Sequence, residues 1–197
     1  MHILFVCTGN ICRSPTAERL VTAYAATHLP DPSELTASSA GTHAVVGNPM
    51  EPTAAMVLAG LGGDGLNFRA RQITEEQVAA ADVIFTMTRH QRNKVLNSSP
   101  RTLPRTFTLR EAHALLAAVS VDSLPDPDDL TRRGRQLVAE MGRLRATRIP
   151  NSKRSDDIGD PIGRDVDTFL RIGDDIAVSL LAWLAVCCGI KNAPSSV

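Results

Sequence analysis

The chain of 197 residues is poor in aromatic side chains, which make up 4% of it, and has no excess charge of either sign. Because 21 basic residues balance 21 acidic ones, a dedicated binder of nucleic acid or of an anionic membrane surface is not expected. Four cysteines are too few for a disulfide scaffold, and none of them forms a CxxC pair or a Cys/His spacing typical of zinc. The 43% of hydrophobic residues are sufficient for one buried core, so a single domain is expected.

Long hydrophobic runs are also missing. The apolar start of the chain is too short for a signal peptide and lacks a basic leading segment. The stretch from Ile176 to Ile190 is shorter than the roughly 18 residues of a membrane span, and it follows Asp174 and Asp175. We therefore expect a buried terminal helix, no membrane span, and a cytoplasmic protein with reduced thiols. No motif indicates the oligomeric state.

Strand-forming and helix-forming segments alternate along the chain. The expected strands are residues 2–6, 35–40, 82–87 and 106–109. The expected helices are residues 16–27, 53–61, 75–81, 89–97 and 165–188, and Pro15 is expected at the first helical position before residue 16. Residues 111–148 are expected to form two further helices, separated by a break at 125–129. This alternation predicts parallel βαβ units and a sheet covered on both faces. We expect a domain over residues 1–190, a loop at 151–155 and a disordered tail at 191–197.

The first expected strand ends in the loop Cys7-Thr-Gly-Asn-Ile-Cys-Arg-Ser-Pro15, which matches neither nucleotide-binding glycine motif. Its successive N–H groups can converge on one oxyanion at the start of a helix, because Gly9 and Asn10 tolerate positive φ. Arg13 offers a bidentate fork to two phosphate oxygens. Cys7 at the bottom of such a nest lies in a positive field, which favours the thiolate. The alternative interpretation is a buried core cysteine and a solvated arginine.

The segment VCTGNICRSPTAE resembles the signature of the low-molecular-weight protein tyrosine phosphatases, and the resemblance continues in order along most of the chain. It includes Ser39-Ala-Gly-Thr42, Ala81-Asp-Val-Ile-Phe-Thr-Met87 and Asp157-Ile-Gly-Asp-Pro161. The resemblance implies a three-layer αβα sandwich with a four-stranded parallel sheet and a phosphate-binding loop after the first strand. It also implies a cysteinyl-phosphate mechanism acting on phosphotyrosine in a protein substrate.

A phosphatase of this kind needs a proton donor for the leaving oxygen. Three Asp-Pro pairs are candidates. Asp31 is expected to end the first helix, and Asp126 precedes capping carboxylates of a later helix. Asp160 lies in an irregular loop before the last helix, where the family places its acid, and we therefore assign the acid to Asp160.

The implied catalytic residues are Cys7 as nucleophile, Arg13 as phosphate ligand and Asp160 as acid and then base. In this scheme Ser14 donates a hydrogen bond to the Cys7 sulfur and Asn10 braces the loop. The residues expected to bind phosphate are Thr8, Gly9, Asn10, Ile11, Cys12, Arg13 and Ser14. No metal or other cofactor is needed, because Arg13 and the backbone supply positive charge.

Cys12 matches the family position that forms a reversible disulfide with the nucleophile, although an inert thiol is the alternative. Cys187 and Cys188 are expected to be core residues. A thioredoxin-coupled arsenate reductase shares the fold, but it needs cysteines after the third strand, where Met87–Lys94 has none. A non-catalytic phosphate-binding protein would not need nucleophile, arginine and acid together.

The expected substrate cleft consists of Ile11, His43, Val45 and Ile162. Phosphoarginine phosphatases of the same family tend to have Thr at the position of Ile11, which favours phosphotyrosine. The cleft loops nevertheless lack the aromatic rings usual in phosphotyrosine members, so protein arginine phosphatase is the alternative function.

The segment 111–155 is rich in arginine and resembles the family least, so we interpret it as a helical insertion. Its arginines either flank the cleft mouth and attract an anionic substrate or form a solvated face. They are Arg132, Arg133, Arg135, Arg143, Arg145 and Arg148.

Overall fold

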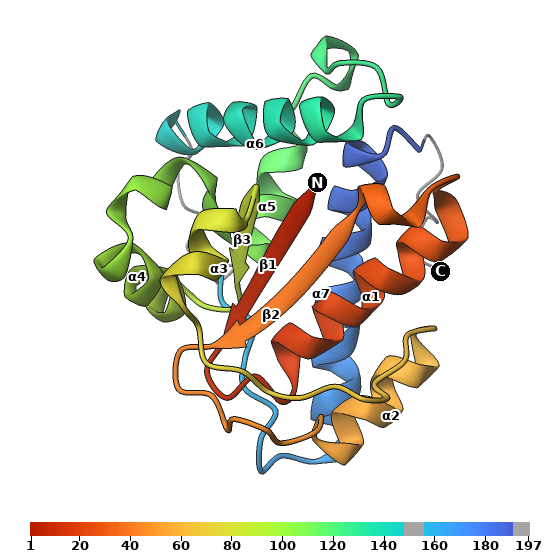
Figure 1. Ribbon diagram of the computed structural model, residues 1–197, viewed down its shortest axis with the longest axis vertical. Coiled ribbons are helices and arrows are strands. Elements are labelled where there is room, and N and C mark those ends of the chain that lie inside the picture. The colour runs from red at the N-terminus through yellow and green to blue at the C-terminus, as the bar shows by residue number, and fades with distance from the viewer. Residues whose placement is uncertain (148–155, 191–197) are drawn as a thin grey trace.

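The computed structural model describes residues 1–147 and 156–190 of the chain. Within them, four parallel strands form one sheet in the order β2-β1-β3-β4 (Figure 1). The strands are β1 (His2–Cys7), β2 (Thr36–Gly41), β3 (Val83–Thr86) and β4 (Thr106–Thr108). The predicted α/β class with a four-stranded parallel sheet is confirmed.

Helices cover both faces of this sheet. The α-helices are α1 (Arg13–His28), α2 (Pro52–Gly60), α3 (Glu75–Ala80), α4 (Arg89–Ser98), α5 (Leu109–Leu116), α6 (Leu130–Thr147) and α7 (Val166–Cys187). Short 3₁₀ helices are η1 (Pro32–Glu34), η2 (Pro100–Arg105) and η3 (Val121–Ser123). In the described ranges, no helix has both the length and the apolar character needed to cross a bilayer.

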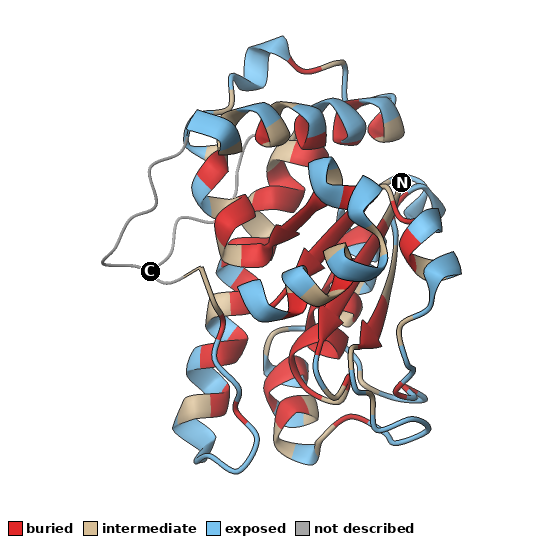
Figure 2. Ribbon diagram, turned by 90° about the vertical axis from the view of Figure 1, so that its left-hand side faces the viewer, coloured by how far each residue is buried: buried red, intermediate tan, exposed pale blue. Residues whose placement is uncertain are grey.

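The central strand β1 contributes to two separate cores, because successive side chains of a strand point to opposite faces. Ile3 and Phe5 belong to the larger core, which α1, α2, α5, α6 and α7 complete. Leu4 and Val6 belong to a smaller core with Val78 of α3 and Val95 of α4. Figure 2 shows the buried strands between the two helical layers. Burial on both faces explains why the apolar residues of this strand run continuously in the sequence.

Several boundaries differ from the expected ones, most clearly at α1. This helix begins at Arg13 rather than Thr16, so Pro15 is its third residue and not its first. The difference has a simple reason: amides of the first helical turn have no intrahelical partner, so a proline is tolerated anywhere in it. The other expected elements are present with ends displaced by one or two residues, except that α5 extends only over Leu109–Leu116.

The arginines of α6 do not flank the mouth of the site, so that expectation is wrong. The N-terminal ammonium of Met1 donates to Thr131 Oγ1 (3.1 Å), and Arg135 Nε donates to Asp82 Oδ1 (2.8 Å) just before β3. α6 therefore lies across the amino ends of the strands (Figure 1), whereas Cys7 ends β1 at the opposite edge.

The individual arginines of α6 serve packing and local pairing. Arg133 is buried and donates to the carbonyls of Val186 and Pro125. Arg145 stacks on the Phe107 ring, with its guanidinium carbon 3.8 Å from the ring centroid. Arg143 pairs with Glu140 of the same helix. Arg148, the expected loop at 151–155 and the expected tail at 191–197 lie outside the described residues, and the division into domain and insertion stays a prediction.

Trp183 of α7 is the largest fully buried side chain and joins three elements. Its ring meets Phe85 of β3 edge-on, with centroids 5.1 Å apart and planes at 76°. Its Nε1–H points to Met141 Sδ of α6 at 3.3 Å. Trp183 thus holds α6 and α7 on the sheet.

We expect Trp183→Ala to lower the free energy of unfolding by about 3–5 kcal/mol, because it leaves a cavity between three elements. Urea denaturation measures this loss. Val178→Ala on the same helix is the control, since that side chain is 53% exposed and its truncation should cost less than about 0.5 kcal/mol. Equal losses in the two variants would contradict the packing described.

Candidate active site

The loop after β1 is held by a second loop, which follows β2. The amides of Thr42, His43 and Val45 donate to the carbonyls of Cys7, Thr8 and Gly9 at 2.9–3.0 Å, and the amide of Glu51 donates to Ile11 (2.9 Å). In a trans peptide the N–H group points away from the C=O group. Because these four carbonyls face the second loop, the amides that follow them point away from that loop, and of these the Asn10 amide reaches the Cys7 sulfur.

The Cys7 sulfur lies at the bottom of this loop and is buried. It accepts hydrogen bonds from the Asn10 amide (3.2 Å) and from Ser14 Oγ (2.9 Å). Both donors come from the same loop and from the first turn of α1. The sulfur is therefore placed among donors, which is an environment suited to a negatively charged thiolate.

Asn10 adopts a left-handed conformation with φ of 57° and is fully buried. Its Nδ2 donates to Ser14 Oγ (3.0 Å) and to Ser39 Oγ of β2 (2.8 Å), and its Oδ1 accepts from the Arg71 amide (2.8 Å). Asparagine is one of the few residues that tolerate this backbone conformation, so one residue supplies both the turn and three side-chain contacts.

A buried polar chain continues behind Asn10. Ser39 Oγ donates to Glu18 Oε2, and Glu18 Oε1 accepts from Arg71 Nη2 (2.8 Å). Glu18 is nearly buried, so its carboxylate is compensated by the Arg71 guanidinium and by the hydroxyl of Ser39. The chain links α1, β2 and the segment before α3 to the base of the loop.

Arg13 and Asp160 come together from distant parts of the chain. The Arg13 side chain is 4% exposed, and its Nη2 pairs with Asp160 Oδ2. Its Nη1 donates to the Ile158 carbonyl (3.2 Å), and the Ile158 amide donates to the Met87 carbonyl at the end of β3 (2.7 Å). The loop containing Asp160 is thereby anchored to the sheet beside the Cys7 loop.

The other two Asp-Pro pairs lie elsewhere. Asp31 Oδ1 accepts from the Ser33 amide (2.9 Å) and caps η1. Asp126 Oδ1 accepts from the Asp128 amide (3.1 Å) shortly before α6. Of the three aspartates, Asp160 is the one that contacts Arg13, and its side chain is 51% exposed.

Cys12 is a buried neighbour in the same loop. Burial, reinforced by the carboxylate of Glu51 and by Cys7, raises the pKa of the Cys12 thiol well above its ordinary value. Cys12 therefore remains a neutral thiol at physiological pH. All four cysteines are unpaired in this structure, and a Cys7–Cys12 disulfide stays a prediction. Cys187 and Cys188 are core residues, as expected.

The four expected cleft residues are only partly brought together. Ile11 and Val45 both flank Gly9, since a Cβ placed there would lie 3.6 Å from each side chain. Ile162 is 50% exposed and its amide donates to Asp160 Oδ1 (3.2 Å). His43 is exposed, and its Nδ1 lies 3.2 Å from Lys94 Nζ of α4.

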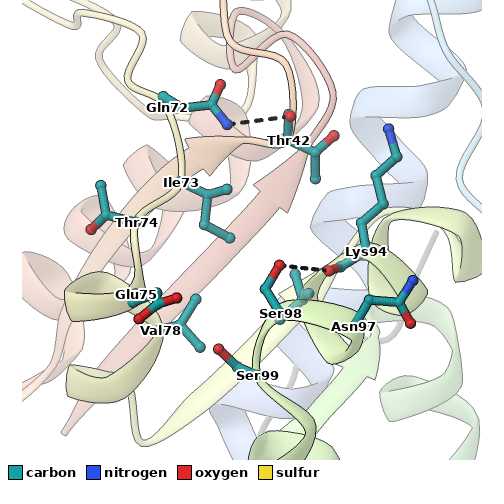
Figure 3. Close-up of a pocket in the computed structure, with 11 residues that line it drawn as sticks. Thr42, Gln72, Ile73, Thr74, Glu75, Val78, Lys94, Asn97, Ser98 and Ser99 are labelled. Atoms are coloured by element: carbon teal, nitrogen blue, oxygen red, sulfur yellow. Dashed lines mark hydrogen bonds between the residues drawn. The ribbon is translucent and has the colours of Figure 1, made fainter.

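A separate cavity of about 450 Å³ lies between α3 and α4 (Figure 3). Ile73 and Val78 contribute apolar surface to it, and Gln72 bonds the Thr42 carbonyl at its edge (3.2 Å). None of Cys7, Arg13 and Asp160 lines this cavity, so it is separate from the loop that contains Cys7.

Sequence reasoning missed several residues that support the site, namely Glu18, Ser39, Arg71 and Gln91. Glu18 and Ser39 lie in segments quoted for the family resemblance, but no contact could be assigned to them. Gln91 has a local signal, because Thr88 and Gln91 form a capping box at the start of α4. That pattern predicts the cap but not the contact of Gln91 Nε2 with Thr8 Oγ1 (3.1 Å). The other three depend on contacts between segments distant in sequence.

The fold and the loop geometry together define a class, the α/β phosphatases that carry a cysteine in a phosphate-sized loop. Residues 2–141 match the family described as low molecular weight phosphotyrosine protein phosphatase. The chain belongs to this family of enzymes, and the family expected from the sequence is confirmed.

Three relatives illustrate the similarity. A probable low molecular weight protein-tyrosine-phosphatase EpsP of Ralstonia nicotianae is 38% identical over 109 residues, or 55% of this chain and 70% of its own. A protein-arginine-phosphatase of Bacillus subtilis is 29% identical over 154 residues, covering 78% of this chain and 100% of its own. The crystal structure of the Erwinia amylovora tyrosine phosphatase AmsI has a TM-score of 0.64 and 24% identity over 93% of this chain and 90% of its own, and shows a shared fold.

We expect substitutions at Asn10 to separate its backbone role from its side-chain role. Asn10→Gly and Asn10→Ala both remove three hydrogen bonds, but only alanine is strained at a φ of 57°. Asn10→Ala should therefore be less stable than Asn10→Gly by about 1 kcal/mol in urea denaturation. Equal stability of the two variants would show that the loop relaxes out of the left-handed conformation.

Proposed function

We propose that the chain hydrolyses phosphomonoesters through a phosphocysteine on Cys7, with Arg13 binding the phosphoryl group and Asp160 transferring protons. The observation that carries this proposal is the arrangement around the Cys7 sulfur. Two donors contact it, the Asn10 amide and Ser14 Oγ, and the Arg13 guanidinium pairs with the Asp160 carboxylate. Among the described residues, buried Arg13 Nε has no hydrogen-bond partner, and a bound oxyanion would supply one.

In the first step, the Cys7 thiolate attacks phosphorus in line with the leaving oxygen. An S–P bond forms, the P–O bond to the leaving group breaks, and protonated Asp160 gives its proton to the departing oxygen. The amides of residues 8–13 and the guanidinium of Arg13 hold the equatorial oxygens, on which negative charge is concentrated.

In the second step, water attacks the phosphocysteine. Asp160, now a carboxylate, takes a proton from the water, an O–P bond forms and the S–P bond breaks. Ser14 Oγ and the Asn10 amide donate to the departing sulfur, which stabilises the thiolate that is regenerated. Inorganic phosphate leaves with no metal or other cofactor in either step.

We further propose that phosphotyrosine in proteins is the substrate, as the names of the tyrosine-phosphatase relatives suggest. All seven aromatic residues of the chain are buried, so a substrate ring would rest against aliphatic side chains rather than stack on a ring. Ile11 and Val45 beside Gly9 supply such a wall, with Ile162 beside Asp160. A cytoplasmic location belongs to the same proposal.

Protein arginine phosphatase is the second candidate. The observation that favours it is the match to the Bacillus subtilis protein-arginine-phosphatase over the full length of that relative. A cleft without an exposed Phe, Tyr or Trp side chain is also less selective for a phenyl ring.

An arsenate reductase relay through Cys187 and Cys188 has no structural support. Cys187 Sγ lies 3.6 Å from Met1 Sδ, at the amino end of β1, whereas Cys7 ends this strand. A six-residue strand separates the two ends by about 20 Å.

We expect the purified protein to hydrolyse p-nitrophenyl phosphate in the presence of EDTA. Cys7→Ser should abolish turnover, and Asp160→Ala should lower kcat by about 100-fold or more, with a larger loss for phenyl phosphate because its phenoxide is the more basic leaving group. Asp126→Ala is the control and should retain full activity. Turnover by Cys7→Ser would disprove the mechanism, and a greater loss in Asp126→Ala than in Asp160→Ala would overturn the acid assignment.

Matched phosphotyrosine and phosphoarginine peptides test the substrate. We expect a higher kcat/KM for phosphotyrosine, and Ile11→Thr should shift the ratio toward phosphoarginine by at least threefold, because it removes aliphatic surface beside Gly9. Phosphate release from each peptide is measured. A preference of the unmodified protein for phosphoarginine would establish the second candidate instead.

A further inference from the structure

Gln91 is a buried glutamine in the third position of α4, with 2% of its surface exposed. It belongs to the capping box with Thr88, in which the Gln91 amide donates to Thr88 Oγ1 (3.2 Å). The same box occurs at the start of α3, where Thr74 and Gln77 exchange equivalent bonds. The two boxes differ in what else the glutamine touches.

The Gln91 side chain makes two contacts beyond its cap. Its Oε1 accepts from the Thr88 amide (2.9 Å), as the cap requires, and also from the Met87 amide (3.0 Å). Its Nε2 donates to Thr8 Oγ1 (3.1 Å). The buried Gln91 carboxamide therefore connects Thr8, the residue after Cys7, to the backbone amides of Met87 and Thr88 between β3 and α4.

Both of these partners lead to the reacting groups. Thr8 follows Cys7 directly, and its carbonyl is already bonded by the His43 amide (3.0 Å), so the Gln91 bond fixes the second polar group of this residue. Met87 accepts from the Ile158 amide, and Ile158 in turn accepts from Arg13. Gln91 thus contacts both Thr8 of the Cys7 loop and Met87, the residue that holds the Asp160 loop through Ile158.

We propose that Gln91 is a positioning residue for the reaction: by holding Thr8 against the end of β3, it sets the place of the phosphate loop relative to Arg13 and Asp160. This inference rests on the proposed function. A misplacement of about 1 Å at a reacting group lowers catalysis by about 100-fold, so a single bond of this kind can have a large kinetic effect. Ground-state binding of phosphate depends on it less, since an oxyanion can shift within the loop.

The test replaces Gln91 by methionine, which has similar length but no hydrogen-bonding amide. Gln77→Met is the matched control, because it removes the same cap from α3 without touching the phosphate loop. Turnover of p-nitrophenyl phosphate gives kcat and KM, and inhibition constants are measured for vanadate, which imitates the five-coordinate transition state, and for inorganic phosphate. Thermal unfolding is followed for each variant.

We expect Gln91→Met to lower kcat about 10- to 100-fold and to weaken vanadate inhibition by a similar factor. Its phosphate inhibition constant should change by less than about threefold, and Gln77→Met should keep the kcat of the unmodified protein. A kcat of Gln91→Met within about twofold of the unmodified value, or equal weakening of vanadate and phosphate, would overturn the positioning role.

Thr8→Val keeps the proposal testable if Gln91→Met does not fold, because it removes the same bond from the other side. Thr8→Val should lower kcat and vanadate affinity in the same pattern, and the double variant should lose no more than the larger single loss. Additive losses, or an unchanged kcat in Thr8→Val, would refute the link. A complete lack of turnover by the unmodified protein would instead contradict the proposed function itself.

Discussion

The site depends on the pairing of one loop with another along the backbone. The carbonyl oxygens of the loop after β1 need hydrogen-bond partners, and the segment after β2 provides them from Thr42 to Glu51. The amides that follow these carbonyls point away from the second loop, and one of them, the amide of Asn10, donates to the Cys7 sulfur. β2 lies beside β1 in the sheet, and this adjacency delivers the second loop to the first.

Local patterns in the sequence were sufficient for the fold class and for the loop that carries Cys7 and Arg13. The continuous apolar residues from Ile3 to Val6 indicated a strand buried on both faces, and the two cores confirm it. Gly9 and Asn10 predict a wrapped loop because few residue types accept positive φ; Asn10 has this conformation, whereas Gly9 does not, so the left-handed turn rests on Asn10 alone. The match of residues 2–141 confirms the family that these patterns resembled.

Contacts between distant segments were beyond this reasoning. The arginines of α6 could be counted but not placed, because their position depends on how a helix crosses the amino ends of the strands, with Arg135 bonded to Asp82. The contacts of Gln91 and Arg71 cannot be predicted for the same reason. Gln91 bonds Thr8, which is 83 residues away, and Arg71 bonds Glu18, which is 53 residues away. The observed start of α1 lies three residues before the expected one, because a proline is acceptable throughout the first turn of a helix.

The burial of every Phe, Tyr and Trp ring has a consequence for spectroscopy. Trp183 is the single tryptophan, and it is enclosed by Phe85 and Met141 on the sheet side of α7. Trp183 does not belong to the residues around Cys7, and none of those residues absorbs in the near ultraviolet. Tryptophan fluorescence, excited at wavelengths where Tyr24 does not absorb, therefore reports the packing of α6, α7 and β3, and the occupancy of the Cys7 loop has to be read from an added label or from turnover.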